Sequence, residues 1–236
     1  MPALRIRLHL AVELLDDLAP DAEVKKCEWF NPQLPHGNLT RAQRVRYAVQ
    51  AGLTNNFVRK ALKVDIDKTI KKFTKHVETL NSLTHVNRKT FGMSAAETAK
   101  FVDESLDVFV SLFDTIDNCR ESIRDKLITK AHQAVTHEVI SDTVDALEEI
   151  ATHYTVYGAD LEDFEIATMD SQNLIFIAKG YVDCTLQYGS DGDVERGDGV
   201  RHDDSYPLSC KLVADILTPL DVEVQNLRVD NSSFYE

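Results

Sequence analysis

Apolar residues before position 152 recur with the spacing of helices. One stripe ends before Pro20 and consists of Ile6, Leu10, Leu14 and Leu18. A second stripe, over 66–84, consists of Ile66, Ile70, Phe73, Val77 and Leu80. A spacing of three or four residues places such side chains on one face of an amphipathic helix. We therefore predict a helix in each region, with a loop at 29–38, where two prolines and a glycine interrupt the pattern.

A long helical stretch is predicted after a break at 86–93. Ser94 and Glu97 have the spacing of a capping box, in which each side chain satisfies a free backbone N–H at the start of a helix. Helical patterning continues to about residue 150, with an interruption expected near Asn118. The apolar side of this stretch is expected to consist of Phe101, Leu106, Phe109, Val110 and Phe113.

The apolar period changes to two after residue 152, which is typical of strands. Gly180 lies between two such runs, where a turn or a bulge is expected. The predicted strands are 153–157, 163–168, 173–179 and 181–188, followed by an apolar run at 212–217 and an alternation near 222–229. The fold class is therefore α+β: a helical domain over 1–152 and a β-rich, mainly antiparallel domain over 153–236.

Charge is distributed unevenly along the 236 residues. The net charge is −13, yet residues 39–89 carry 12 Lys and Arg against three acids, and residues 90–236 carry 10 against 30. No apolar run approaches the ~20 residues of a membrane helix. The four cysteines lie far apart without a CxxC pair, which disfavours a disulfide scaffold and favours a reducing cytoplasm. The basic segment attracts phosphates, or the two segments are solvated faces of one fold.

The basic segment contains a helix-turn-helix pattern at 44–63. Thr40 can cap a helix over 41–50, and Thr54 a second helix that ends near 62. Ala48 and Gly52 have the spacing of the small residue and the turn glycine, and the apolar anchors are Tyr47, Ala51, Leu53, Val58 and Ala61. The outward residues suit base edges and phosphates and are Asn55, Asn56, Arg59, Lys60 and Lys63. An ordinary basic helix pair explains the same pattern.

Four carboxylates follow the last strong strand within a short glycine-rich loop at 189–199. The candidate metal ligands are Asp191, Asp193, Glu195 and Asp198, and the candidate catalytic residues are Asp191, Asp193 and Asp198. Clustered carboxylates suit Mg²⁺ or another divalent cation, and Mg²⁺ suits phosphodiester cleavage. The calcium-loop pattern fails, because Arg196 replaces its glycine and His202 its final glutamate. A solvated hairpin loop whose carboxylates cap backbone amides is the alternative interpretation.

The remaining chemistry-bearing residues give no established motif. His132 and His137 are five apart and do not share a helix face, so hydrogen-bonded or surface positions are expected for them. The sequence lacks a GxSxG elbow, a Walker loop, a dinucleotide fingerprint and a zinc spacing. Hydrolase, NTPase and dehydrogenase classes with those signatures are therefore disfavoured.

A family resemblance adds to this interpretation. The stretch 182–193, with Gly197-Asp-Gly199 and Ser205-Tyr-Pro-Leu208, resembles the predicted pPIWI-associating nucleases of bacterial conflict and phage-defence loci. Residues 41–58 and 80–91 are also similar to that family. Tyr206 and Leu208 stand where the family has phenylalanines. The resemblance implies no catalytic residue, but it implies a functional loop of Gly189, Ser190, Asp191, Asp193, Gly197, Asp198 and Gly199.

Three functions follow from these observations. The leading hypothesis is a bacterial defence-type protein that acts on nucleic acid as a metal-dependent nuclease, with a protein partner from its defence locus. The alternative is a non-enzymatic sensor or adaptor whose C-terminal domain binds a small ligand or a partner protein, which the acidic C-terminal part favours. The third is a helix-turn-helix regulator. An oligomer through the helical half is also compatible with the sequence.

Overall fold

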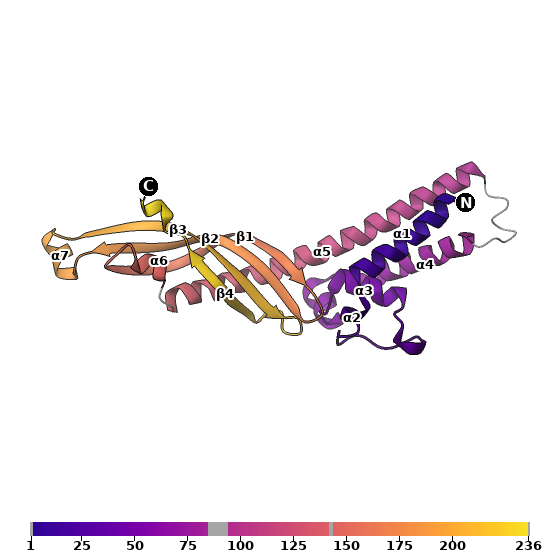
Figure 1. Cartoon of the computed structure of the whole chain (residues 1–236), viewed down its shortest axis with the longest axis horizontal. Coiled ribbons are helices and arrows are strands. Elements are labelled where there is room, and N and C mark those ends of the chain that lie inside the picture. Colours follow the sequence, from indigo (N-terminus) through magenta and orange to yellow (C-terminus); the bar gives the residue numbers. More distant parts are fainter. Residues whose placement is uncertain (1, 85–93, 142–143, 236) are drawn as a thin grey trace. The chain divides into compact units, whose positions relative to one another are not determined.

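The computed structural model describes residues 2–84, 94–141 and 144–235, so the predicted break at 86–93 lies outside the described residues. The chain forms two compact units. The first comprises Met1–Ile123 with Asp170–Gln172, and the second comprises Arg124–Met169 with Asn173–Glu236. The chain runs through helices first and strands last, as Figure 1 shows, so the predicted α+β class is confirmed.

Helices make up the first unit. Its elements are α1 (Pro2–Leu18), α2 (Asp21–Val24), η1 (Pro35–Gly37), α3 (Arg41–Gln50), η2 (Phe57–Leu62), α4 (Ile66–Thr84) and the first part of α5 (Ala95–Ser141). The loop near 29–38 is irregular apart from the single turn η1. The predicted capping box of Ser94 and Glu97 forms and precedes α5, and the predicted cap Thr40 begins α3 as part of a second capping box with Gln43. None of the helices in the described ranges combines the length and apolarity that crossing a membrane demands.

The buried stripes agree with the prediction in α4 but not in α1 or α5. All five residues of the α4 stripe are buried. In α1 the buried line is Ala11, Leu15 and Ala19, while Ile6 and Leu10 are 59% and 55% exposed. Small side chains on that line let α1 approach α3 and α4 closely, which a search for large apolar residues does not detect.

The side of α5 that packs on α4 includes polar contacts. Ser105 Oγ forms a 2.8 Å hydrogen bond with His76 Nε2, and the hydroxyl oxygens of Thr115 and Thr69 lie 2.9 Å apart. Leu106, Val110 and Phe113 were expected in the core but are 50%, 57% and 42% exposed. The buried line consists of Ser105, Val108, Leu112, Ile116, Cys119 and Ile123. Two apolar stripes therefore run along this helix, and spacing alone does not decide which of them is buried. The helix also continues through Asn118 without the expected interruption.

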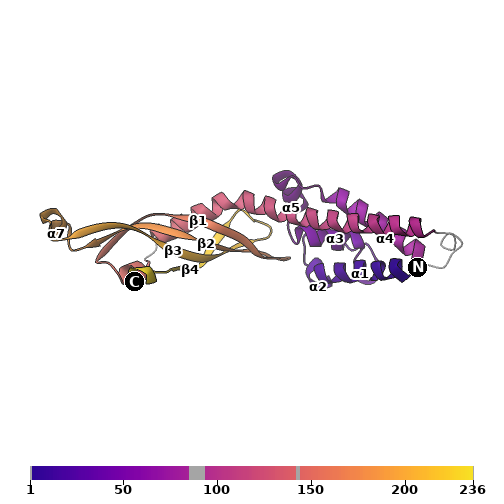
Figure 2. The same cartoon turned by 90° about the horizontal axis from the view of Figure 1, so that it is seen from above.

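An antiparallel sheet dominates the second unit. Its strands are β1 (His153–Met169), β2 (Asn173–Tyr188), β3 (Val200–Asp215) and β4 (Val222–Val229), in the order β1-β2-β3-β4. Three short helical segments complete it: α6 (Asp145–Glu148), α7 (Asp191–Arg196) and η3 (Ser232–Tyr235). The C-terminal part of α5 runs beside the sheet in Figures 1 and 2. There His132 Nε2 accepts a 3.2 Å hydrogen bond from the Leu161 amide of β1.

The four short strands predicted over 153–188 are two long strands in the structure, β1 and β2, and Gly180 lies inside the second of them. β2 continues straight through Gly180, which pairs with Leu161 of β1, and the bulge lies in β1 between Leu161 and Asp163. A Cβ at Gly180 would lie 1.8 Å from the Asp160 carbonyl oxygen. The glycine therefore permits a close approach of two backbones. Of the two expectations for this position the turn is wrong, and the bulge occurs opposite Gly180 in β1.

Candidate nucleic-acid pocket and acidic turn

The turn between α3 and η2 has an unusual backbone. The Leu53 amide donates to the Gln50 carbonyl at 3.0 Å, which closes the turn around Ala51 and Gly52. Ala51 has φ 46° and ψ −130°, a conformation that favours glycine. Gly52 was expected to supply the turn conformation, but it serves close packing: a Cβ there would lie 2.6 Å from the Ser171 carbonyl oxygen.

Three groups hold this turn in place. Trp29 Nε1 donates a 2.9 Å hydrogen bond to the Ala51 carbonyl. The Gly52 amide donates to the Asp170 carbonyl at 3.0 Å. Ser171 is buried and donates a 2.5 Å hydrogen bond to Glu23. Contacts on both sides therefore maintain a backbone conformation that costs of order 1–3 kcal/mol.

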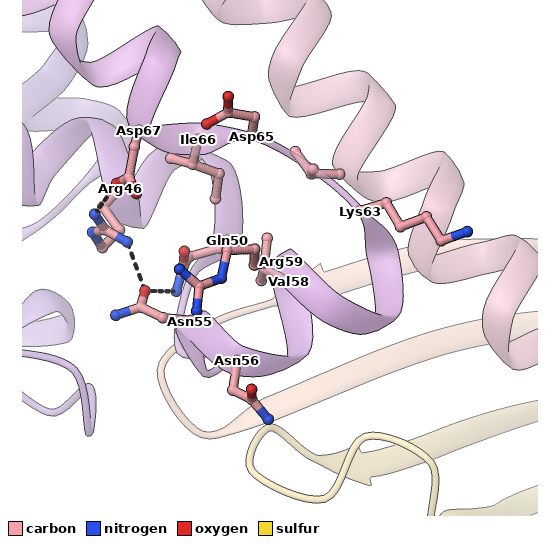
Figure 3. Close-up of a pocket in the computed structure, with 11 residues that line it drawn as sticks. Arg46, Gln50, Asn55, Asn56, Val58, Arg59, Lys63, Asp65, Ile66 and Asp67 are labelled. Carbon is pink, nitrogen blue, oxygen red and sulfur yellow. Dashed lines mark hydrogen bonds and ion pairs between the residues drawn. The ribbon is translucent and has the colours of Figure 1, made fainter.

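A polar network of Arg46, Gln50, Asn55 and Asp67 is joined to the turn at the Leu53 carbonyl, and Figure 3 shows its side chains. Gln50 Nε2 donates to the Leu53 carbonyl and, at 3.1 Å, to Asn55 Oδ1. Arg46 donates to the same Asn55 oxygen at 2.6 Å and to Asp67 Oδ1 at 2.7 Å. These bonds fix the orientation of the Gln50 and Asn55 amides, because each donor meets a defined acceptor.

The network forms one wall of a pocket of about 680 Å³. All five predicted nucleic-acid residues are exposed, and four of them line this pocket: Asn55, Asn56, Arg59 and Lys63. Lys60 is exposed on the same segment but does not line it. In Figure 3, Arg59 extends toward the network and Lys63 extends away from it. The predicted anchors are buried, apart from Ala61, which is half-buried.

The charges around the pocket are unequally compensated. Arg46 is paired with Asp67, and Asp65 Oδ1 accepts a 3.2 Å hydrogen bond from the Lys68 amide at the start of α4. Arg59 and Lys63 form no ion pair with any residue that the structure describes. The pocket therefore presents two free cationic side chains together with amide groups, a set of donors that suits phosphate.

The glycine-rich loop after β2 is a short helix with a capping box. Ser190 Oγ accepts a 3.2 Å hydrogen bond from the Asp193 amide, and Asp193 Oδ2 accepts from the Ser190 amide at 2.9 Å. Together they cap α7, which Figure 1 shows at the end of the β2–β3 hairpin. Gly189 and Gly197 have φ of 95° and 84°, so glycine suits both ends of this turn.

Two arginines engage the predicted carboxylates. Arg201 donates to Asp191 at 2.8 Å, and Arg196 donates to Asp193 at 2.6 Å. Hydrogen bonds from Gln187 and Arg201 lower the pKa of Asp191, and hydrogen bonds from Ser190 lower the pKa of Asp193. Asp198 lies 3.8 Å from Arg196 and is 76% exposed, against 81% for Asp191 and 36% for Asp193, and of the three carboxylates it has the longest contact with an arginine.

The carboxylates of the acidic turn do not converge on one point. Within residues 2–84, 94–141 and 144–235, no three His, Cys, Asp or Glu side chains are grouped as a metal ion needs. Asp191 forms an ion pair with Arg201, and Asp193 forms one with Arg196. Among the described residues, Glu195 shares no ion pair with either arginine. The metal site stays a prediction, and the capping interaction of Asp193 explains part of the acidic pattern.

Two family models match this chain, and both carry the description "Predicted pPIWI-associating nuclease". One matches residues 6–109 and the other residues 116–235. The chain belongs to this family. No curated protein and no solved structure gives a significant match.

Two residues that depart from the expected pattern of the pPIWI-associating nucleases fit the fold. Tyr206 and Leu208 are both buried on the inner face of β3. The Tyr206 hydroxyl donates a 2.8 Å hydrogen bond to Asp204, so its polar atom has a partner despite burial. Both substitutions therefore keep the apolar packing that phenylalanine would provide.

The other chemistry-bearing side chains of this family member have structural partners. His76 is stacked on Phe101 and bonded to Ser105, whose hydroxyl donates to the Phe101 carbonyl at 2.8 Å. His76 must therefore donate to Ser105, so the pair lacks the general base of a hydrolytic dyad. The four cysteines are buried and free, and burial raises the pKa of the Cys27 and Cys119 thiols to about 12.

Arg46 and Gln50 are the pocket residues that the sequence prediction missed. Gln50 has no exposed surface, and its Oε1 finds no hydrogen-bond partner among the described residues. A signal for it exists in the sequence. Gln50 is a polar residue inside the apolar run 47–53, one helical turn after Arg46.

Proposed function

We propose that this protein binds nucleic acid through the pocket of its helical unit and cleaves it, as the family description suggests. The observation that carries the proposal is the pair of uncompensated cations, Arg59 and Lys63, beside fixed amide groups. The surrounding segment 39–89 has a net charge of +9, which attracts a phosphate backbone over a longer range.

We also propose a PIWI-like protein as its partner, in a bacterial defence system. The support is the association named in the family description. The acidic residues 90–236 would repel nucleic acid, so binding is assigned to the basic segment 39–89 and not to the sheet.

Binding is tested with the double variant Arg59→Gln/Lys63→Gln. The logarithm of the association constant falls linearly with the logarithm of the salt concentration, and each lost phosphate contact reduces the steepness of that line by about one. The slope of the double variant should therefore be shallower by about two. Lys126→Gln/Lys130→Gln is the matched control, because it removes the same charge from exposed positions of α5 outside the pocket. Equal weakening by both pairs, or no binding by the wild type at low salt, contradicts the proposal.

Cleavage is tested separately at Asp198. Asp198→Asn keeps the side-chain shape and removes the charge, so a catalytic carboxylate should lose orders of magnitude in rate with an unchanged melting temperature. Asp183→Asn is the control, since Asp183 is an exposed carboxylate of β2 that lies outside the acidic turn. Full nuclease activity in Asp198→Asn would remove Asp198 from the reaction.

A further inference from the structure

The orientation of the Gln50 side chain is determined by its neighbours. Its Nε2 faces two acceptors, the Leu53 carbonyl and Asn55 Oδ1, and an amide has only two N–H donors. If the Gln50 amide were turned over, its oxygen would face the Leu53 carbonyl oxygen and Asn55 Oδ1, and three acceptors would meet without a hydrogen. Gln50 Oε1 is therefore a fixed, buried acceptor in the pocket wall that lacks a donor among the described residues.

An unpaired buried acceptor indicates that the pocket receives a donor. Leaving such a group without a partner costs about 1–3 kcal/mol, and native structures contain few of them. The phosphodiester of a nucleic-acid backbone cannot supply this donor, because it carries no proton at neutral pH and its oxygens only accept. Arg59 and Lys63, in contrast, can bind only an acceptor or an anion. The pocket therefore suits a ligand that carries both an anionic group and an N–H group.

We propose that the pocket binds one unpaired nucleotide of a single strand, with its phosphate at Arg59 and Lys63 and a base N–H at Gln50 Oε1. This inference rests on the proposed function and names its substrate class. Every nucleobase has a Watson–Crick N–H, which pairing occupies in a duplex. Gln50 has no exposed surface in the free protein, so a base reaches its Oε1 only if it enters the pocket and the side chains that cover Gln50 move aside. The volume of about 680 Å³ lies within the range of small-ligand pockets.

The test compares three probes on the full wild-type chain. They are a fluorescein-labelled single strand, the same strand annealed to its complement, and a strand of equal length with abasic sites. The single strand should bind about tenfold more tightly than either of the others, because only it offers a base N–H while phosphates are present in all three. Equal affinity for the three probes overturns this inference and leaves the proposed function intact. No binding of any probe overturns the proposed function, and this inference with it.

The role of Gln50 is tested with Gln50→Leu. This change removes the acceptor, together with the Nε2 bonds to Leu53 and Asn55, so the measured quantity is the ratio of the two affinities: the single strand should lose its advantage over the abasic strand. If a folded Gln50→Leu protein still prefers the single strand to the abasic strand by the same factor, another residue recognises the base and the inference is overturned. If this variant fails to fold, Arg59→Gln decides, since Arg59 is exposed. It should weaken the single strand and the abasic strand by the same factor, and unequal factors would contradict the assignment of Arg59 to phosphate.

Discussion

Replacing Gly180 by alanine should destabilise the sheet by about 4 kcal/mol. The new Cβ would lie 1.8 Å from the Asp160 carbonyl oxygen and 2.8 Å from Leu161 Cα. A relaxed carbon–oxygen contact is about 3.3 Å, so β1 must move away by about 1.5 Å. Such a shift stretches about two ladder hydrogen bonds at ~1 kcal/mol each and adds an overpacking cost of about 2 kcal/mol.

Thermal melts of the full chain, followed by far-ultraviolet circular dichroism, measure this loss. At about 2–4 °C per kcal/mol, the melting temperature should fall by roughly 8–16 °C. Gly158→Ala is the matched control, because Gly158 lies in β1 and an added Cβ would meet no described atom within 4 Å. The control should melt within about 2 °C of the wild type. The close approach of β1 and β2 at Gly180 would be refuted if Gly180→Ala melted at the wild-type temperature, or if both variants lost the same number of degrees.

Three further predictions concern side chains of both units. Burial lowers the pKa of His76 below its ordinary 6.5, so the unfolded state binds the proton more readily and stability falls below about pH 6.5. His76→Gln should lose less stability than the wild type on acidification, and identical pH profiles would contradict this. The four buried cysteines should resist a thiol reagent until the chain unfolds, and fast labelling of the native protein would show otherwise. If the predicted metal site exists, Mg²⁺ or Mn²⁺ should raise the melting temperature of the wild type but not of Asp191→Asn/Asp193→Asn, and equal shifts would remove it.

Features set by neighbours in the sequence could be predicted. The cap at Thr40 and the capping box at Ser94 depend on residues at most three positions apart, and the apolar stripe of α4 depends on spacing within one helix. The helix caps and the apolar stripe both depend on residues close together in the sequence, so they can be predicted without knowledge of the fold. The register of β2 is different, because the need for Gly180 arises from Asp160 in another strand.

The acidic turn shows how one pattern can support two interpretations. Ser190 and Asp193 have the same spacing as Ser94 and Glu97, so a capping box was available as an explanation. Carboxylates close together in the sequence also suggest a metal site, and sequence alone does not decide which atoms they face. In the structure, Arg196 and Arg201 reach them from either side of the turn, and Arg201 comes from the following strand.

Strain at Ala51 and the free acceptor of Gln50 are adjacent features of one turn, and each explains the other. Gln50 can hold its amide under the turn only if the chain reverses at once, which Ala51 accomplishes with φ 46°. Residues 170–172 and Trp29 stabilise that reversal from outside, through Gly52 and the Ala51 carbonyl. Asp170–Gln172 belong to the same compact unit, although they lie far along the chain in the region matched by the second family model. The pocket therefore depends on segments from both matched regions, which is a physical reason for the two regions to occur together in one chain.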